Sequence, residues 1–163
     1  KGATFTVRLP LMLPVEAQPH VDIEKSPRVH SLEKPGVLLD GLRVLIVDDE
    51  DDARELVSVM LGRAGATMKS AASAREAMEI IESWRPDVLI ADIGMPVEDG
   101  YGLIKRVRAL PREQGGQIPA LALTAYARTE DRVRALSAGY QVHLSKPVDR
   151  VELAAVVARL AER

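Results

Sequence analysis

Cysteine is absent from the 163-residue sequence, and its three histidines are widely separated. These absences exclude disulfide bonds, thiol catalysis and cysteine-ligated zinc sites, so a bound ion would need oxygen ligands. No apolar run approaches the roughly 20 residues of a membrane-spanning helix, and no secretion signal is visible. We therefore expect a cytoplasmic segment without direct membrane insertion, and leave open whether a longer parent is membrane-anchored.

The sequence also lacks an excess of charge of one sign, because its 22 Lys and Arg residues nearly balance its 24 Asp and Glu residues and leave a net charge of −2. Without a basic excess, nucleic acid is not an expected partner. With 47% hydrophobic and 28% charged residues, the chain can bury a core and remain soluble, and its length suits one domain plus a tail. Because the first residue is Lys1 and not methionine, we expect a piece of a longer protein.

Three segments differ in composition. Residues 1–13 alternate β-favouring residues in a way that predicts a strand, which prolines then end. Residues 14–40 carry four prolines among mixed charges without an apolar period, which predicts an extended linker. Residues 41–163 have the regular apolar pattern of a folded domain.

Short apolar strands alternate with amphipathic helices about five times in this domain. The expected strands cover residues 43–47, 67–71, 88–92, 120–124 and 142–146. Such alternation predicts an α/β fold with a doubly wound, mostly parallel sheet covered by helices on both faces. The chain is too short for an eight-stranded barrel of roughly 250 residues.

Apolar spacing also predicts which side of each helix is buried. In the first helix we expect Leu56, Val59 and Met60 to face inward, and in the fourth helix Val133 and Leu136. The expected N-caps of the second, third and fifth helices are Ser73, Asp99 and Asp149.

Polar residues follow the apolar strands at the points where ligands bind in open α/β sheets. Asp48 and Asp49 follow the first strand, Asp92 ends the third, Thr124 the fourth and Lys146 the fifth. Carboxylates about 4 Å apart repel each other by about 4 kcal/mol at an effective dielectric constant near 20. A divalent cation would compensate for this repulsion, and hard oxygen ligands favour Mg²⁺.

These residue types suit phosphoryl transfer. The carboxylate of Asp92 can attack phosphorus to give an aspartyl phosphate, while a metal ion and the ammonium of Lys146 screen the charge on the transferring oxygens. The hydroxyl of Thr124 can donate a hydrogen bond to a phosphoryl oxygen.

Four stretches, in this order, carry a family resemblance: residues 44–50 (VLIVDDE), 92–100 (DIGMPVEDG), 123–125 (LTA) and 145–147 (SKP). They resemble the receiver domain of two-component response regulators, and the resemblance covers about residues 42–161. It implies a flavodoxin-like fold, in which a five-stranded parallel sheet in the order 2-1-3-4-5 is flanked by five helices.

The resemblance also implies a role for each site residue. Asp92 corresponds to the phosphoacceptor, Asp48 and Asp49 to the acidic pair that holds Mg²⁺ together with Asp92, and Gly94 to the residue whose main-chain carbonyl binds the metal. Lys146 corresponds to the family's active-site lysine.

Two positions depart from the family pattern. Thr124 corresponds to the switch hydroxyl, but His143 stands where the family usually has Phe or Tyr as the partner of that switch, so the coupling between them is expected to be altered. Gly94 lacks the side chain that often influences how fast the phosphoryl group is lost. The phosphoryl lifetime is therefore open.

Residues 2–10 (GATFTVRLP) resemble the terminal strand of the ATP-binding domain of histidine kinases. This resemblance implies the C-terminal part of a hybrid histidine kinase, with residues 1–13 ending the catalytic domain. The phosphoryl donor would be a phosphohistidine of a histidine kinase or of a histidine phosphotransfer protein. The fragment itself would catalyse only its own phosphorylation and dephosphorylation, whereas the parent would be a transferase.

Two other functions fit part of the sequence. A receiver-like docking module that acts without phosphorylation is the main alternative, and His143 and Gly94 favour it. A Mg²⁺-dependent phosphatase of the haloacid dehalogenase kind needs a second aspartate two residues after the nucleophile, where this chain has Gly94. Because the chain ends at Arg163, no DNA-binding domain is expected to follow, and output is expected through protein contacts.

Overall fold

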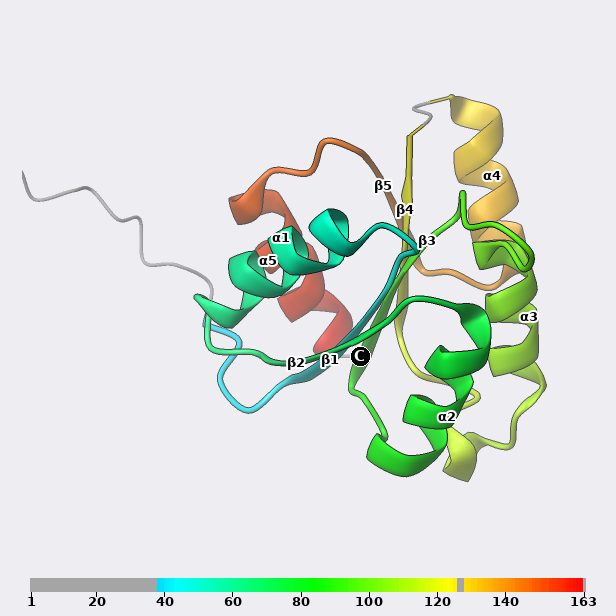
Figure 1. Ribbon diagram of the computed structural model, residues 1–163, viewed down its shortest axis with the longest axis horizontal. Coiled ribbons are helices and arrows are strands. Elements are labelled where there is room, and N and C mark those ends of the chain that lie inside the picture. The colour runs from blue at the N-terminus through cyan, green and yellow to red at the C-terminus, as the bar shows by residue number, and fades with distance from the viewer. Residues whose placement is uncertain (1–37, 126–127, 163) are drawn as a thin grey trace, which may run out of the picture. The chain divides into compact units, whose positions relative to one another are not determined.

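The computed structural model describes residues 38–125 and 128–162 (Figure 1). The strand expected within residues 1–13, and the linker expected over residues 14–40 as far as residue 37, lie outside the described part. Leu39, which falls within the expected linker, is buried, and its main-chain N–H donates to the carbonyl of Ala64. Packing of the domain thus includes residues just before its first strand.

Five strands and five α-helices alternate along the described chain, as predicted. The strands are β1 (Arg43–Val47), β2 (Thr67–Ala71), β3 (Val88–Asp92), β4 (Ala120–Thr124) and β5 (Val142–Ser145). The helices are α1 (Asp51–Gly62), α2 (Ala74–Trp84), α3 (Gly100–Ala109), α4 (Thr129–Ala138) and α5 (Arg150–Ala161), with a short 3-10 turn at Arg112–Gln114.

The strands form one parallel sheet in the order β2-β1-β3-β4-β5, which confirms the predicted flavodoxin-like topology. Figure 1 shows α1 and α5 on one face of the sheet and α2, α3 and α4 on the other. Because every strand points the same way, the carboxyl ends of β1, β3, β4 and β5 share one edge of the sheet. That edge carries the candidate site.

The central strands are buried on both faces, as continuous apolar runs in a covered parallel sheet require. Ile46, Ile90 and Leu123 pack toward α1 and α5, whereas Leu45 and Leu89 pack toward α2 and α3. These side chains are at most 1% exposed. This packing gives the strand ends a rigid base.

The prediction for the inner face of α1 was wrong for Leu56 and Val59, whereas Met60 is partly buried and packs against the core, as predicted. Leu56 and Val59 are 53% and 44% exposed, and the buried side chains of this helix are Val57 and Leu61. Apolar residues occupy nearly every position from 56 to 61, so two overlapping faces fit a helical period. The packing of α1 against α5 and β2 decides between the two faces.

The prediction for α4 was also wrong. Val133 and Leu136 are 58% and 40% exposed, and the small Ala135 is the buried residue of this helix. Half-buried Ala138 packs against the same part of the core as Ala135, on the side of the sheet covered by α2 and α3. Close approach to the sheet therefore favours small residues on the inner side of α4, and its larger apolar residues face outward.

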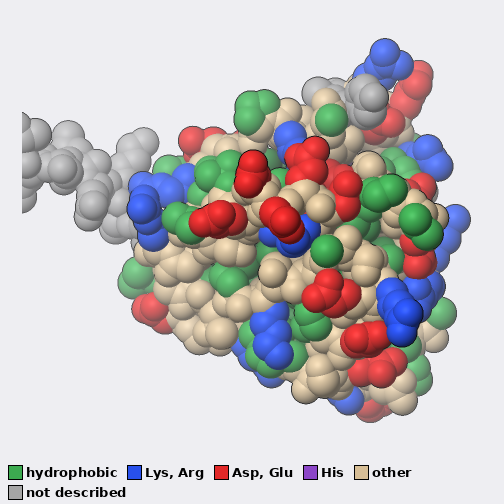
Figure 2. Space-filling model, in the orientation of Figure 1, with side chains coloured by type: hydrophobic (Ala, Val, Ile, Leu, Met, Phe, Trp, Pro, Cys, Tyr) green, Lys and Arg blue, Asp and Glu red, His purple; other side chains and the backbone are tan. Residues whose placement is uncertain are grey.

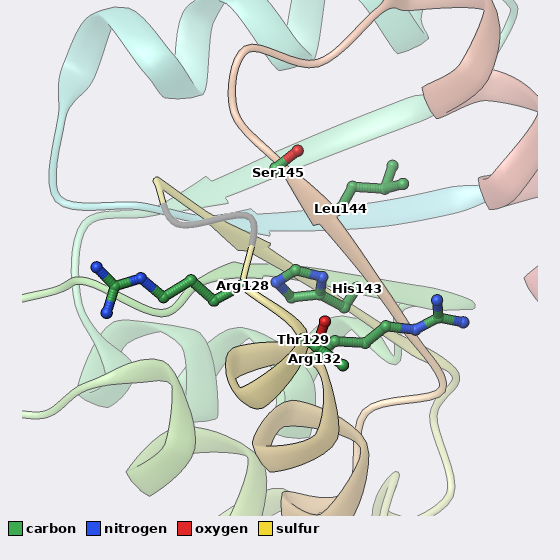
Figure 3. Close-up of a pocket in the computed structure, with 6 residues that line it drawn as sticks. All are labelled: Arg128, Thr129, Arg132, His143, Leu144 and Ser145. Carbon is green, nitrogen blue, oxygen red and sulfur yellow. The ribbon is translucent and has the colours of Figure 1, made fainter.

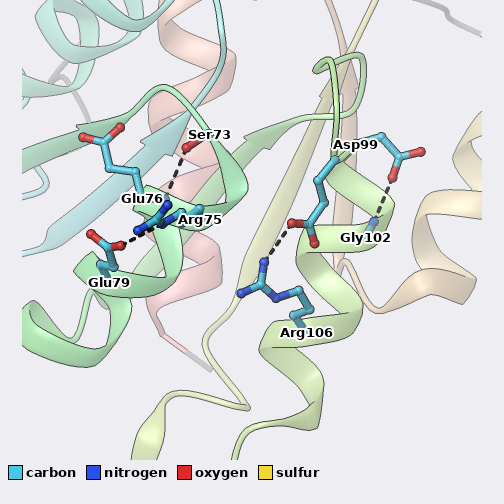
Figure 4. A network of polar contacts seen from close by, with 8 residues as sticks. Ser73, Arg75, Glu76, Glu79, Asp99, Gly102 and Arg106 are labelled. Carbon is cyan, nitrogen blue, oxygen red and sulfur yellow. Dashed lines mark hydrogen bonds and ion pairs between the residues drawn. The ribbon is translucent and has the colours of Figure 1, made fainter.

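Three predicted N-caps are confirmed. The Ser73 hydroxyl accepts a hydrogen bond from the main-chain N–H of Glu76, and the Asp99 carboxylate accepts one from that of Gly102 (Figure 4). Asp149 accepts bonds from the N–H groups of Val151 and Glu152. Each bond satisfies a donor that the first turn of a helix leaves without a partner.

Candidate functional site

Three carboxylates meet at the carboxyl edge of the sheet. Each of Asp48, Asp49 and Asp92 offers an oxygen, and these atoms all lie within 4.8 Å of one another. Asp48 and Asp92 are almost fully buried, whereas Asp49 is exposed. In Figure 2, acidic side chains gather on the surface over this edge and the start of α1. The predicted cluster of acids is therefore present.

Lys146 bridges two of these acids. Its Nζ lies 2.7 Å from Oδ2 of Asp48 and 2.8 Å from Oδ1 of Asp92. Burial by itself would lower the pKa of Lys146, but the hydrogen bonds that its ammonium donates to Asp48 and Asp92 outweigh burial and hold this pKa above its usual value. The ammonium thus remains charged and partly balances the repulsion between the carboxylates.

The loop after β3 holds Asp92 from the other side. The main-chain N–H of Gly94 donates to Oδ2 of Asp92 at 2.6 Å. Gly100, the first residue of α3, lies so close that a Cβ there would be 2.4 Å from the main-chain oxygen of Asp92. A side chain at position 100 would therefore push α3 away from the end of β3.

All three oxygens of Asp48 accept hydrogen bonds. Its Oδ1 accepts from the main-chain N–H of Glu50 at 3.0 Å, its Oδ2 from Lys146, and its main-chain oxygen from Nη1 of Arg54 at 2.5 Å. Arg54 is not among the residues predicted from the sequence to belong to the site. One signal in the sequence could have indicated Arg54: it is a basic residue near the start of a helix, where the helix dipole disfavours positive charge.

The donor set suits Mg²⁺. Asp48, Asp49 and Asp92 provide hard carboxylate oxygens, and among the described residues no histidine belongs to the cluster. Mg²⁺ commonly binds through one or two carboxylates, water and a phosphate oxygen. The triad therefore has the donor atoms of a magnesium site. The contribution of the Gly94 carbonyl stays a prediction.

Thr124 lies at the same edge, whereas His143 lies two residues before the carboxyl end of β5. Thr124 ends β4, is buried and pairs in register with Ser145. His143 pairs with Ala122 and lines a hollow of about 290 Å³ with residues of α4, among them Arg132 (Figure 3). Its Nε2 is buried and has no hydrogen-bond partner in the described structure.

We expect His143 to make the stability of the domain depend on pH. Burial lowers the pKa of His143, Asp131 opposes this shift and Arg132 adds to it. Since the unfolded chain binds the proton at about pH 6.5 and the folded chain only at lower pH, stability falls as the pH drops through and below about 6.5. Urea denaturation between pH 7.5 and pH 5.5 should therefore show a larger loss for the wild type than for His143→Phe.

His20 and His30 are present in both proteins, so their titration cancels in this comparison. Equal losses of unfolding free energy in the two proteins would contradict the expectation.

Comparison with known proteins places the fold and the site in context. Residues 44–158 match the response regulator receiver domain family. An uncharacterized 14.6 kDa protein of Leptolyngbya boryana is 47% identical over 119 residues, which cover 73% of this chain and 89% of that protein. The hybrid signal transduction histidine kinase D of Dictyostelium discoideum is 31% identical over 145 residues, which cover 85% of this chain and 9% of that kinase.

A solved structure of a related domain has the same fold. The receiver domain of a sensor histidine kinase from Pseudomonas aeruginosa, with a magnesium ion coordinated in its active site cleft, is 32% identical, with a TM-score of 0.69. The match covers 76% of this chain and 99% of that one. None of the helices within residues 38–125 and 128–162 combines the length and the apolar character of a membrane span. By sequence and by topology, this chain belongs to the response regulator receiver domain family.

Proposed function

We propose that this domain accepts a phosphoryl group from a phosphohistidine onto Asp92. The contact between the Asp92 carboxylate and the Lys146 ammonium, beside two further acids, carries the proposal. In the transfer, an Oδ atom of Asp92 attacks phosphorus, an O–P bond forms, and the P–N bond of the donor breaks with its electron pair going to the imidazole. Water later hydrolyses the acyl phosphate and restores the carboxylate.

Each site residue has a role in this step. Asp48 and Asp49 would hold Mg²⁺ with Asp92 and the Gly94 carbonyl, and bound Mg²⁺ would neutralise charge on the phosphoryl oxygens. Lys146 remains charged and can contact the same oxygens. The step depends mainly on positioning and charge, as in other phosphoryl transfers.

Phosphorylation would be read through Thr124 and His143. The modification adds roughly −1.5 to −2 charges, which the Thr124 hydroxyl can meet with a hydrogen bond. His143 lies on β5, which contacts α4, and α4 carries the exposed Val133 and Leu136. A shift of α4 and β5 would change the surface that they present to a protein partner.

We also propose that the parent is a hybrid histidine kinase. Support comes from residues 2–10, which resemble the end of a kinase ATP-binding domain, and from the similarity to a hybrid kinase of which the chain spans 9%. In this proposal residues 1–13 end the catalytic domain, the linker runs from residue 14 to the start of the packed domain at Leu39, and the receiver lies in the cytoplasm, where a kinase has access to ATP.

Transfer from a phosphohistidine tests the function. The protein is mixed with histidine phosphotransfer proteins and kinase domains that carry a labelled phosphohistidine, with MgCl2 or with EDTA. We expect the label to move to this chain only with Mg²⁺, as an acid-stable and base-labile acyl phosphate. No transfer from any donor, and no adduct from a small phosphodonor, would contradict the proposal and favour a docking module that acts without phosphorylation.

A further inference from the structure

Arg54 occupies a position that helix formation alone does not explain. It is the fourth residue of α1, near the positive end of the helix dipole, where a cation is destabilising. Its side chain is only 14% exposed, although arginine is rarely buried without a partner. Sequences that break a local rule of this kind often do so at a functional site.

The contacts of Arg54 lead to the loop that carries the acidic pair. Nη1 donates to the main-chain oxygen of Asp48 at 2.5 Å, and Nη2 forms an ion pair with Asp51. The Asp51 side chain is 89% exposed, so this ion pair is of the kind that contributes little. The partly buried, charge-assisted bond to the Asp48 carbonyl is the stronger contact.

That carbonyl belongs to the peptide group that joins Asp48 to Asp49. Asp49 itself accepts no hydrogen bond from the described residues, so its carboxylate depends on the backbone for its placement. From these contacts we infer that Arg54 is a positioning residue, which fixes the Asp48–Asp49 peptide and so holds the acidic pair ready for Mg²⁺. This inference rests on the proposed function and adds a residue to it.

A magnesium titration tests the inference on the folded domain. Backbone amide shifts of Gly94 and Asp49 are followed by NMR as MgCl2 is added to the wild type, Arg54→Met, Arg54→Lys and Asp51→Asn. We expect Arg54→Met to raise the dissociation constant for Mg²⁺ about tenfold, as loss of a charge-assisted bond implies. Arg54→Lys, which retains one donor, should recover part of the affinity, and Asp51→Asn should stay within about twofold of the wild type.

Arg75→Met provides a matched control, because Arg75 also pairs with an acid on its own helix, Glu79, but lies far from the acidic loop in sequence and is 88% exposed. It should bind Mg²⁺ like the wild type. Thermal denaturation in EDTA shows whether Arg54→Met is folded, and Arg54→Lys provides a second variant if it is not.

The outcomes separate this inference from the proposed function. Wild-type affinity in Arg54→Met, or an equal loss in Asp51→Asn, would overturn the role of the Arg54 contact while leaving phosphoryl acceptance intact. A wild type that responds to neither MgCl2 nor a phosphodonor would instead overturn the proposed function itself.

Discussion

Asp92→Asn will take up no phosphoryl group under conditions in which the wild type gains one. The substitution keeps the size of the side chain but removes the negative charge that makes the carboxylate oxygen a nucleophile. It also removes the ion pair with Lys146, whose Nζ lies 2.8 Å from Oδ1 of Asp92. Intact-mass measurement after incubation with MgCl2 and a small phosphodonor should show one phosphoryl adduct on the wild type and none on the variant.

Asp99→Asn is the matched control for this experiment. Asp99 lies in the loop that follows Asp92 and caps α3, a role that asparagine also fills. It should accept the phosphoryl group like the wild type. An adduct on Asp92→Asn would mean that another carboxylate, Asp48 or Asp49, is the acceptor, and would contradict the assignment of Asp92.

The site could be predicted from sequence because its geometry follows from strand direction. Asp48 and Lys146 are 98 positions apart in the chain and are nevertheless hydrogen-bonded. Asp48 follows a short apolar strand, and Lys146 follows a strand in which apolar and polar residues alternate. Parallel strands bring such strand ends to one edge whatever the length of chain between them. Strand identity and direction were therefore sufficient to bring Asp48, Asp49, Asp92 and Lys146 together.

Helix faces and long side chains were less predictable. The outward-facing Leu56 and Val59 fit the helical period as well as the buried Val57 and Leu61 do, so only tertiary packing selects the inner face. Arg54 was missed for a related reason. Its contact with the Asp48 carbonyl depends on how a flexible side chain folds back over a loop, which residue spacing does not encode.

Lys146→Met is expected to destabilise the metal-free domain, because it leaves the buried carboxylates of Asp48 and Asp92 without their shared cation. Loss of one partner of a buried ion pair costs about 3–5 kcal/mol, and since the Lys146 side chain is 28% exposed we expect about 2–3 kcal/mol here. The raised pKa of Lys146 keeps this contribution complete at neutral pH, and it is lost only as the pH rises through that pKa. Urea denaturation at pH 7 in EDTA measures the difference.

Adding MgCl2 shows whether Lys146→Met loses stability through the missing charge or through poorer packing. In the wild type a cation near Asp48 and Asp92 must compete with the ammonium of Lys146, whereas in Lys146→Met it meets two uncompensated carboxylates. MgCl2 should therefore raise the unfolding free energy of the variant more than that of the wild type. Lys105→Met, at an exposed position of α3, should change stability by less than about 0.5 kcal/mol in either condition. Equal stabilisation of wild type and Lys146→Met by MgCl2 would contradict a shared binding region, because the ammonium and the metal would then not depend on the same two carboxylates.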